Sequence, residues 1–166
     1  MTKATAERLS LEELGAWRAF LRAHSFIQRK LEAELVAEHE LPLASYDVLL
    51  QLAEADDRCL RMTELADRVL LSRSGLTRLV DRLERDGLVE RQACLNDARG
   101  TLAVLTQRGL DRLRGAAPTH LRGISEHVTS RLTTDELAEL QRLMRKLGDP
   151  TAQPPAEGCG AAEGVR

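Results

Sequence analysis

The order of short segments between residues 62 and 105 constrains the fold more than any other feature of the sequence. The spacing of apolar residues predicts a brief helix over Met62 to Leu70, and a tight turn at Leu71 and Ser72 follows it. A second helix is predicted to begin just after Ser72 and to end at Gly87, because glycine commonly terminates helices. Two short helices joined this closely indicate a helix-turn-helix.

The residues around the helix-turn-helix are compatible with extended structure. Arg58 to Arg61 predicts a short extended segment before it, while Leu88 to Cys94 and Thr101 to Leu105 read as two strands after it. Between these strands, Leu95 to Gly100 contains the Asn, Asp and Gly that are typical of turns. We therefore expect a β-hairpin, and a helix-turn-helix followed by a hairpin is a winged helix.

The second short helix has two chemically distinct faces. Its apolar face comprises Leu76, Leu79, Val80 and Leu83. Its opposite face is polar and basic and comprises Ser74, Arg78, Asp81, Arg82 and Arg85. Since the second helix of a helix-turn-helix enters the major groove of DNA, we predict DNA contacts for its start and its basic face: Ser72, Ser74, Thr77, Arg78 and Arg82.

The same arginines have an alternative interpretation that needs no DNA. They could form a solvated face in which acidic neighbours on the same helix neutralise them. The formal net charge of -2 and the pI of about 6.1 also require any DNA-binding surface to be a local patch. A winged helix that binds another protein is therefore an open alternative, although the basic face favours double-stranded DNA.

Two helices are predicted before the helix-turn-helix. Ser10 and Glu13 form a capping box, which starts a long helix that runs to about His39. Pro42 marks the break, and a second helix ends near Glu54. The first of these helices carries a wide apolar stripe, so we expect it to pack on more than its own chain.

Two further helices are predicted after the hairpin. Thr106 can cap a long helix that carries apolar residues as far as Leu132, with a kink expected at Pro118 because proline removes a helix hydrogen bond. A second capping box, Thr133 to Glu136, starts the last helix. Residues 148–166 are rich in proline and glycine and predict a disordered tail.

Composition favours a mainly helical protein without a membrane span. The chain is 43% hydrophobic but has only one Trp, one Tyr and two Phe, so its core must consist mainly of Leu, Ala and Val. The first residues lack a signal peptide's apolar core, and no apolar run approaches the ~20 residues of a membrane span. We expect a cytoplasmic protein. The three cysteines, Cys59, Cys94 and Cys159, are widely spaced and suit reduced thiols.

Residues 62–109, "MTELADRVLLSRSGLTRLVDRLERDGLVERQACLNDARGTLAVLTQRG", resemble the winged-helix core of the MarR family of bacterial transcriptional regulators. The most specific parts are the block "SGLTRLVDRLERDGLVER" and the motif Asp97-Ala-Arg99. The resemblance implies a homodimer whose first and last helices interlock and whose recognition helices lie in major grooves. It also implies that the wing, through Asp97 and Arg99, reaches the adjacent minor groove.

The resemblance divides the chain into functional regions. We expect dimerisation helices at residues 10–40 and 106–147 and a DNA-binding lobe at residues 42–105. A two-fold protein implies a pseudo-palindromic DNA site. The regulator is expected to be a repressor that a small organic ligand releases from DNA.

The resemblance also suggests where that ligand binds. Relatives that respond to organic anions use a pocket between the dimer helices and the DNA-binding lobe. The polar and aromatic residues expected near this junction are Trp17, Arg18, His24, Tyr46 and Asp47. A regulator that senses oxidants through Cys59 or Cys94 is the alternative, although the first helix has no cysteine at the family's peroxide-sensing place.

Neither a metal nor a cofactor is expected. His120 and His127 are two helical turns apart, too far to chelate a metal as an i, i+4 pair does. The chain also lacks a glycine-rich phosphate loop, an HExxH motif and a GxSxG motif. An enzyme is therefore the least favoured class.

Overall fold

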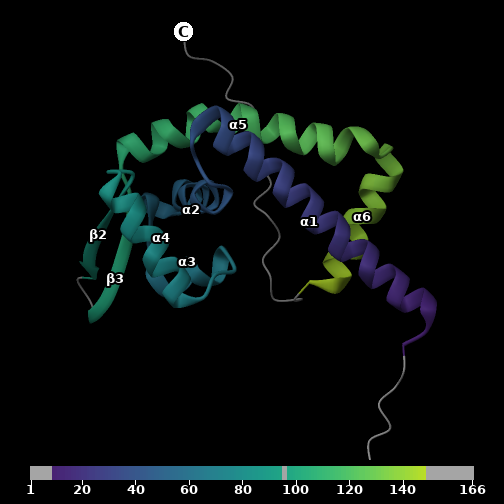
Figure 1. The fold of residues 1–166 in the computed structure, drawn as a ribbon. Coiled ribbons are helices and arrows are strands. Elements are labelled where there is room, and N and C mark those ends of the chain that lie inside the picture. The colour runs from purple at the N-terminus through teal and green to yellow at the C-terminus, as the bar shows by residue number, and fades with distance from the viewer. Residues whose placement is uncertain (1–8, 95–96, 149–166) are drawn as a thin grey trace, which may run out of the picture. The chain divides into compact units, whose positions relative to one another are not determined.

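The computed structural model describes residues 9–94 and 97–148, without the side chains of residues 94–99. It divides into two compact units, Met1–Val128 and Thr129–Arg166, which we describe separately. The helices of the first unit are α1 (Leu11–His39), α2 (Leu43–Glu54), α3 (Met62–Arg68), α4 (Arg73–Arg85) and α5 (Gln107–His127). Its strands are β1 (Cys59–Arg61), β2 (Val89–Cys94) and β3 (Asp97–Leu105) (Figure 1).

Side-chain caps start three of the helices in the first unit, as predicted. The Ser10 hydroxyl accepts a hydrogen bond from the backbone N–H of Glu13 at 3.1 Å, which completes the capping box of α1. Ser72 and Thr106 cap α4 and α5 in the same way. Because each cap is a local contact, the sequence predicted these helix starts correctly.

Helix α3 is shorter than the predicted segment over residues 62–70. It ends at Arg68, and Leu70 takes a left-handed backbone conformation with φ of 53°. The backbone N–H of Leu71 then donates to the carbonyl oxygen of Ala66 at 3.1 Å. This left-handed residue ends the helix and turns the chain toward α4.

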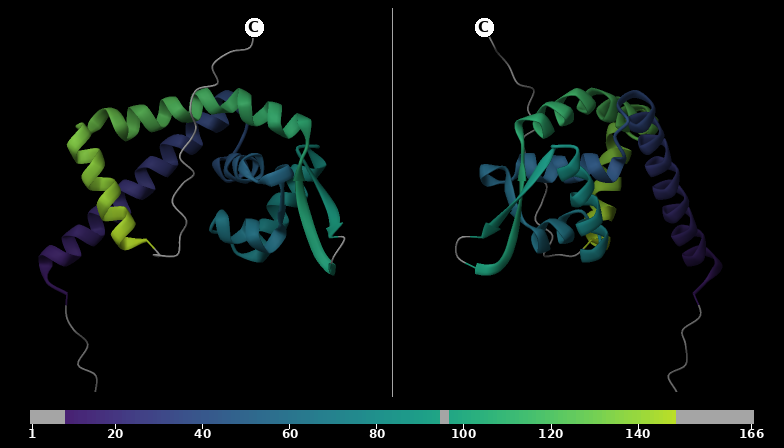
Figure 2. Two further views of the ribbon diagram at one scale, coloured as in Figure 1. Left: turned by 180° about the vertical axis from the view of Figure 1, so that it is seen from behind. Right: turned by 60° about the vertical axis from the view of Figure 1, so that its left-hand side comes forward.

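The three strands form an antiparallel sheet in the order β1-β3-β2. Of the predicted extended segment Arg58 to Arg61, only Cys59–Arg61 forms a strand, β1, because Arg58 ends a short 3-10 helix, Asp56–Arg58. In β1, Leu60 pairs with Ala103 of β3, and both residues are buried. No local sequence pattern indicates this pairing, because it joins residues more than forty positions apart. Figure 2 shows β2 and β3 extending as an arm away from α5.

The predicted turn at Leu95 to Gly100 was too long. Strand β3 begins at Asp97 rather than at Thr101, and the register shifts where Ala93 of β2 gives way to Cys94. The irregular register accommodates the unequal lengths of the two strands, as a β-bulge does. Glycine at position 100 therefore lies within a strand, where it is tolerated near a bulge.

The core of the first unit is centred on α2. Val48, Leu49 and Leu52 are fully buried, and they belong to one cluster with buried residues of α1, α3, α4, α5 and the sheet. Since leucine, valine and alanine supply most of this cluster, the core has the aliphatic composition that the sequence predicted. Its role for the site is to hold α3 and α4 in a fixed orientation.

Helices α1 and α5 pack closely at Gly123. A Cβ atom there would lie 2.5 Å from Oε2 of Glu34 and 2.7 Å from Cδ2 of Leu31, so a larger residue would displace these side chains. Polar contacts flank the crossing: Glu34 contacts His127 at 2.5 Å, and Thr119 donates to Glu38 at 2.9 Å. The second half of α1 is thereby fixed to α5.

Helix α5 continues through Pro118 but ends earlier than predicted. The helix was expected to extend to Leu132, whereas it ends at His127 and Val128 leaves the helical region. Val128, Thr129 and Ser130 are all weak helix formers, which explains the early end. No helix among residues 9–94 and 97–148 is long and apolar enough to cross a membrane.

The second unit contains a short 3-10 helix, Thr129–Arg131, and α6, Thr134–Leu147. The predicted capping box is present, since the Thr133 hydroxyl accepts from the backbone of Glu136 and the Glu136 carboxylate accepts from the backbone of Thr133. The predicted tail after Gly148 lies outside the described residues.

Candidate nucleic-acid interface

Helix α4 is anchored at its start by the turn that precedes it. The Ser72 hydroxyl accepts a hydrogen bond from the backbone N–H of Gly75 at 3.1 Å and lies 3.3 Å from the hydroxyl of Ser74. Both hydroxyls are exposed at the positive end of the helix, where an anion such as a phosphate is favoured. The site that the sequence predicted at this helix start is thus accessible.

The two predicted faces of α4 are observed. Leu76, Leu79, Val80 and Leu83 are buried against the core. The polar residues Ser74, Thr77, Arg78, Asp81, Arg82 and Arg85 are exposed. Because the core fixes the apolar face, the basic side chains are held outward.

The arginines of α4 are not neutralised by their own helix. Arg85 donates only to the backbone carbonyl of Asp81 at 3.3 Å, and no ion pair joins Arg78 or Arg82 to another described residue. Arg82 instead lines a cavity of about 570 Å³ beside the beginnings of α2 and α5. The described side chains of α4 therefore do not form the self-neutralised face that the alternative interpretation required.

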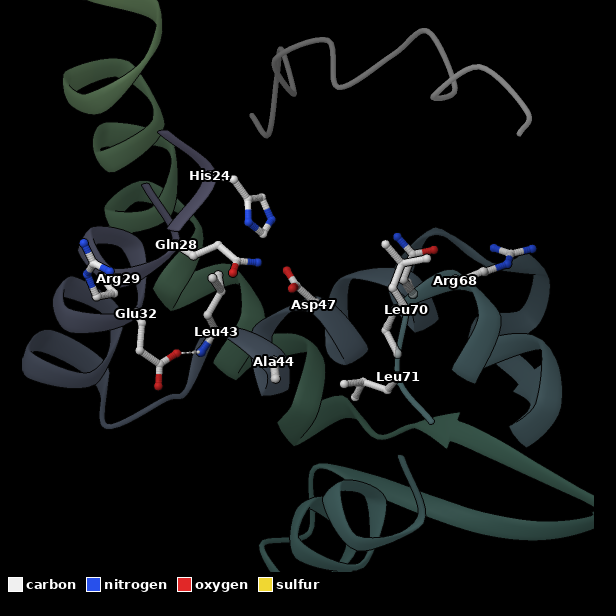
Figure 3. A pocket seen from close by; sticks show the side chains of 12 residues that line it. His24, Gln28, Arg29, Glu32, Leu43, Ala44, Asp47, Arg68, Leu70 and Leu71 are labelled. Carbon is white, nitrogen blue, oxygen red and sulfur yellow. Dashed lines mark hydrogen bonds between the residues drawn. The ribbon is translucent and has the colours of Figure 1, made fainter. Parts of the chain in front are cut away.

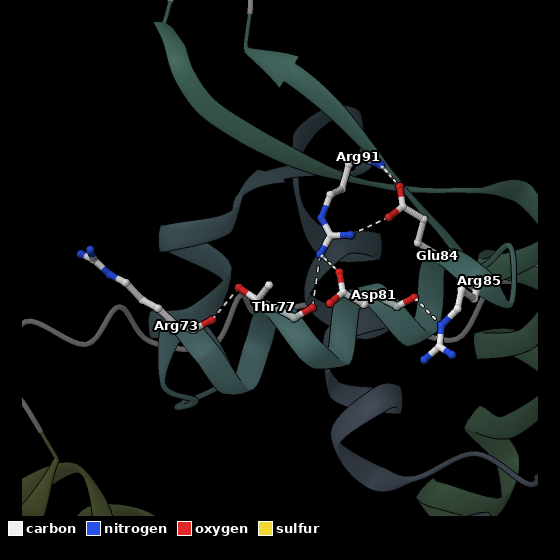
Figure 4. A network of polar contacts seen from close by, with 6 residues as sticks. All are labelled: Arg73, Thr77, Asp81, Glu84, Arg85 and Arg91. Carbon is white, nitrogen blue, oxygen red and sulfur yellow. Dashed lines mark hydrogen bonds and ion pairs between the residues drawn. The ribbon is translucent and has the colours of Figure 1, made fainter.

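The acidic residues of α4 are bound by Arg91, which lies on β2. Its guanidinium contacts Asp81 at 2.6 Å and Glu84 at 2.5 Å, and it donates to the carbonyl oxygen of Thr77 at 3.2 Å (Figure 4). Burial acts to lower the pKa of Arg91, but the hydrogen bonds and the negative charges of Asp81 and Glu84 together outweigh it, so the pKa is raised. Arg91 thus pairs with both carboxylates, so these carboxylates do not pair with the arginines of α4.

This contact also joins the wing to the recognition helix. The backbone N–H of Arg91 donates to Glu84 at 3.1 Å, so both the main chain and the side chain of β2 are bound to α4. A cavity of about 400 Å³ lies beside this junction and is lined by Arg61, Thr77 and Arg91 among others. No sequence pattern indicates the role of Arg91, because its partners become neighbours only when β2 folds back along α4.

Two of the predicted DNA contacts lie at the end of the wing. Asp97 and Arg99 belong to β3 rather than to the predicted turn. Their side chains lie outside the described part of the chain.

Thr77, another predicted DNA contact, lies on α4. Its hydroxyl donates to the carbonyl oxygen of Arg73 at 2.8 Å, so the hydroxyl oxygen can still accept a hydrogen bond.

A larger cavity of about 680 Å³ lies on the side of the helix-turn-helix that faces α1 and α2 (Figure 3). Its lining comes from α1, α2, the end of α3 and the turn before α4: His24, Gln28, Arg29, Glu32, Leu43, Ala44, Asp47, Gln51, Arg68, Val69, Leu70 and Leu71. The cavity therefore contacts the segment that leads into the recognition helix.

Two of the five predicted pocket residues, His24 and Asp47, line this cavity. The other three, Trp17, Arg18 and Tyr46, are absent from its lining. Tyr46 is buried in the core with its ring 4.4 Å from that of His120, and Trp17 stacks on Phe20. The periodicity of α1 and α2 could not separate residues that face the core from those that face the cavity.

The charges around the large cavity are unevenly compensated. Arg68 pairs with Glu64 at 2.8 Å, and Glu32 accepts a hydrogen bond from the backbone N–H of Leu43 at 2.6 Å. The pKa of Asp47 is raised, first by burial and second by the nearby negative charge of Glu32. Asp47 is therefore a carboxylate whose surroundings disfavour its negative charge.

Two further predictions concern metals and cysteines. Glu34, Glu126 and His127 have ligand atoms within 4.8 Å of one another, a spacing that a metal ion could bridge, but Glu34 and His127 already contact each other. Cys59 is half-buried on β1 and is not part of a disulfide. The side chain of Cys94 and the whole of Cys159 lie outside the part of the chain that the structure describes.

Comparison with known proteins supports the nucleic-acid interpretation. Residues 39–100 match the sequence model of the MarR family. The multiple antibiotic resistance protein MarR of Escherichia coli is 31% identical over 126 residues, which cover 75% of this chain and 86% of that protein. The transcriptional regulator MhqR of Bacillus subtilis is 29% identical over 113 residues, covering 68% of this chain and 76% of MhqR.

Solved structures are similar over most of the chain. Sco3205, a MarR family regulator from Streptomyces coelicolor crystallised with DNA, gives a TM-score of 0.83 at 34% identity, covering 95% of this chain and 97% of its own. A mutant of Escherichia coli MarR complexed with operator DNA gives a TM-score of 0.75 at 28% identity, covering 86% of this chain and 100% of its own. Both relatives were thus captured with bound DNA.

Proposed function

The chain belongs to the MarR family of DNA-binding transcriptional regulators, and from this premise we propose that it is a homodimeric repressor released from DNA by a small molecule. It is a regulator and not an enzyme. We place its action in the cytoplasm, where the DNA is.

The observation that carries the proposal is the state of the arginines on α4. Arg78 and Arg82 are exposed, and the carboxylates that could neutralise them, Asp81 and Glu84, are bound by Arg91. A basic helix face that is not neutralised from within is suited to the phosphates and base edges of a major groove. We assign DNA contact to the predicted set: Ser72, Ser74, Thr77, Arg78, Arg82, Asp97 and Arg99.

Exposed apolar side chains support a dimer. The first half of α1 exposes large apolar residues that its own unit leaves uncovered, among them Leu11, Trp17 and Leu21. Helix α6 has no buried residue and exposes Leu143 and Leu147 among others. Such surfaces are typical of interfaces, so we assign residues 10–40 and 106–147 to dimerisation and residues 42–105 to DNA binding.

A two-fold dimer predicts a two-fold DNA site. The recognition helices of the two protomers would contact half-sites about one turn of DNA, ~34 Å, apart. The site should therefore be pseudo-palindromic. Arg99 on the wing would lie in the minor groove, where the negative potential attracts cationic side chains.

The large cavity supports control by a small molecule. Its lining includes Val69, Leu70 and Leu71, which lead directly to Ser72, the cap of α4. A ligand that binds better when this turn is displaced would favour a conformation in which α4 is misplaced for DNA. Coupling of ~1 to 3 kcal/mol between ligand and DNA would be typical of such a switch.

The proposal is tested by selecting DNA that the full-length protein retains from a random-sequence pool, followed by gel-shift and sedimentation measurements. We expect a pseudo-palindromic consensus, a dimer at micromolar concentration and one dimer per site. The DNA that flanks the protein's own gene is the first natural sequence to test. A stable monomer, or a consensus with a single asymmetric half-site, would contradict the proposed assembly.

A further inference from the structure

Neither carboxylate that lines the large cavity, Asp47 or Glu32, is paired with a cation among the described residues. In Figure 3 the Asp47 side chain lies between Gln28 and Leu70, with Arg29 and Arg68 on opposite sides of it. No hydrogen bond or ion pair joins the Asp47 carboxylate to another residue within the described ranges. This charged group is the polar centre of the cavity.

The electrostatic surroundings of Asp47 are negative or neutral. Glu32 lies close enough to raise the pKa of Asp47, after the larger effect of burial. Arg68 is already paired with Glu64 at 2.8 Å. On the α1 wall, His24 and Gln28 lie nearest Asp47, and each can donate or accept a hydrogen bond, whereas the cation Arg29 lies beyond Gln28 from Asp47 (Figure 3).

Apolar side chains of the turn, Leu70 and Leu71, lie on the other side of Asp47 from Gln28 (Figure 3). Val69 of the turn and Leu43 of α2 also line the cavity. Leu70 is 91% exposed and has φ of 53°, so the backbone holds an apolar side chain outward at the expense of strain. The cavity therefore places the half-buried carboxylate of Asp47 beside an apolar surface.

From this arrangement we propose that the cavity binds a compact organic cation, a protonated amine on an apolar or aromatic framework. The ammonium group donates to the carboxylate of Asp47, and the framework packs on Leu70 and Leu71. An organic anion, the ligand class of those relatives that use a pocket at this place, would put its charge beside Asp47 and Glu32 and would be repelled there. This inference names the ligand class for the switch and rests on the proposed function only for its regulatory consequence.

Bound amine would relieve the unfavourable state of Asp47. An opposite charge within a few ångströms stabilises a buried carboxylate that is otherwise disfavoured by desolvation. Charge-assisted hydrogen bonds are also roughly twice as strong as neutral ones. Since the framework would contact the turn before α4, binding there is coupled to the position of the recognition helix.

The test uses three probes that share one aromatic framework: phenethylamine, hydrocinnamate and phenethyl alcohol. Their affinities for the full-length protein without DNA are measured by calorimetry or by NMR titration. We expect phenethylamine to bind at least about tenfold more tightly than hydrocinnamate. The reason is that hydrocinnamate cannot donate the charge-assisted hydrogen bond to Asp47. The alcohol should fall between them.

Variants connect the preference to Asp47. Asp47→Asn should remove the preference for the amine, while Asp56→Asn, an exposed aspartate outside the cavity, should retain it. Leu70→Ser changes an exposed side chain and should weaken all three probes alike. This second variant tests the site even if Asp47→Asn fails to fold.

The proposal is overturned if hydrocinnamate binds as tightly as phenethylamine, if Asp47→Asn retains the amine preference, or if no probe binds at millimolar concentration. Release of the selected DNA by phenethylamine is measured separately by gel shift. Binding without release would contradict the regulatory role and would leave the ligand class supported. Failure of the DNA selection would contradict the proposed function without affecting the binding result.

Discussion

Replacing Arg91 with methionine should weaken both the fold and DNA binding. Methionine retains an apolar stem but removes the ion pairs to Asp81 at 2.6 Å and Glu84 at 2.5 Å. Arg91 is 24% exposed, and its partners are 51% and 40% exposed, so each pair is partly screened by solvent. At ~0.5 to 1 kcal/mol for each pair, the free energy of unfolding should fall by ~1 to 2 kcal/mol.

The effect on DNA binding should be of similar size. Without Arg91, the carboxylates of Asp81 and Glu84 remain on a helix that faces phosphates, and β2 loses its attachment to α4. A cost of ~1 to 2 kcal/mol corresponds to a roughly 5- to 30-fold weaker complex. The loss should be greater at low salt, since exposed charges are less screened there.

Urea unfolding and gel-shift titration measure the two effects. Arg114→Met is the matched control, because Arg114 is exposed on α5 and lies outside the residues assigned to DNA contact. A double-mutant cycle of Arg91→Met with Glu84→Gln should give a coupling energy of ~0.5 to 1 kcal/mol. Zero coupling, together with DNA affinity within twofold of the wild type, would refute the role assigned to Arg91.

Two further predictions concern stability and redox sensing. Gly109→Ala should lower the free energy of unfolding by ~1 to 3 kcal/mol or more, because a Cβ would lie 2.1 Å from the carbonyl oxygen of Leu88. On the same helix, a Cβ at Gly115 would meet nothing within 4 Å, so Gly115→Ala should raise the free energy of unfolding by ~0.5 to 1 kcal/mol. Equal stabilities of the two variants in urea titration would contradict the close packing of Gly109 on Leu88. Cys59→Ser should leave DNA binding unchanged with and without peroxide, because this thiol has no reactive-cysteine motif. Gel shifts in which peroxide releases only the wild type would favour the redox alternative.

Local signals explain why most helix starts were predictable. Ser10, Ser72, Thr106 and Thr133 each cap a helix through a contact only three residues away, so the sequence contains both partners side by side. Helix ends were less predictable. The end of α3 depends on a left-handed conformation at Leu70, which leucine rarely adopts and which no sequence pattern signals.

Contacts between distant segments explain what the sequence did not predict. The faces of α4 follow from helical periodicity alone, and both were predicted correctly. By contrast, the role of Arg91 depends on β2 returning beside α4, and strand β1 depends on pairing with β3. The cavity could be predicted only as a region, since helix rotation decides that Asp47 lines it whereas the adjacent Tyr46 enters the core.

The central claim is that the exposed face of α4 reads DNA as one of a two-fold pair. The most direct measurement is the sequence preference of Arg78→Ala across a library of single-base variants of the selected site. Arg114→Ala, an exposed arginine on α5, is the control. We predict a loss of ~1 to 3 kcal/mol on the preferred site and a relaxed preference at one symmetry-related position in each half-site. An unchanged profile for Arg78→Ala, or a change confined to one half-site, would contradict the claim.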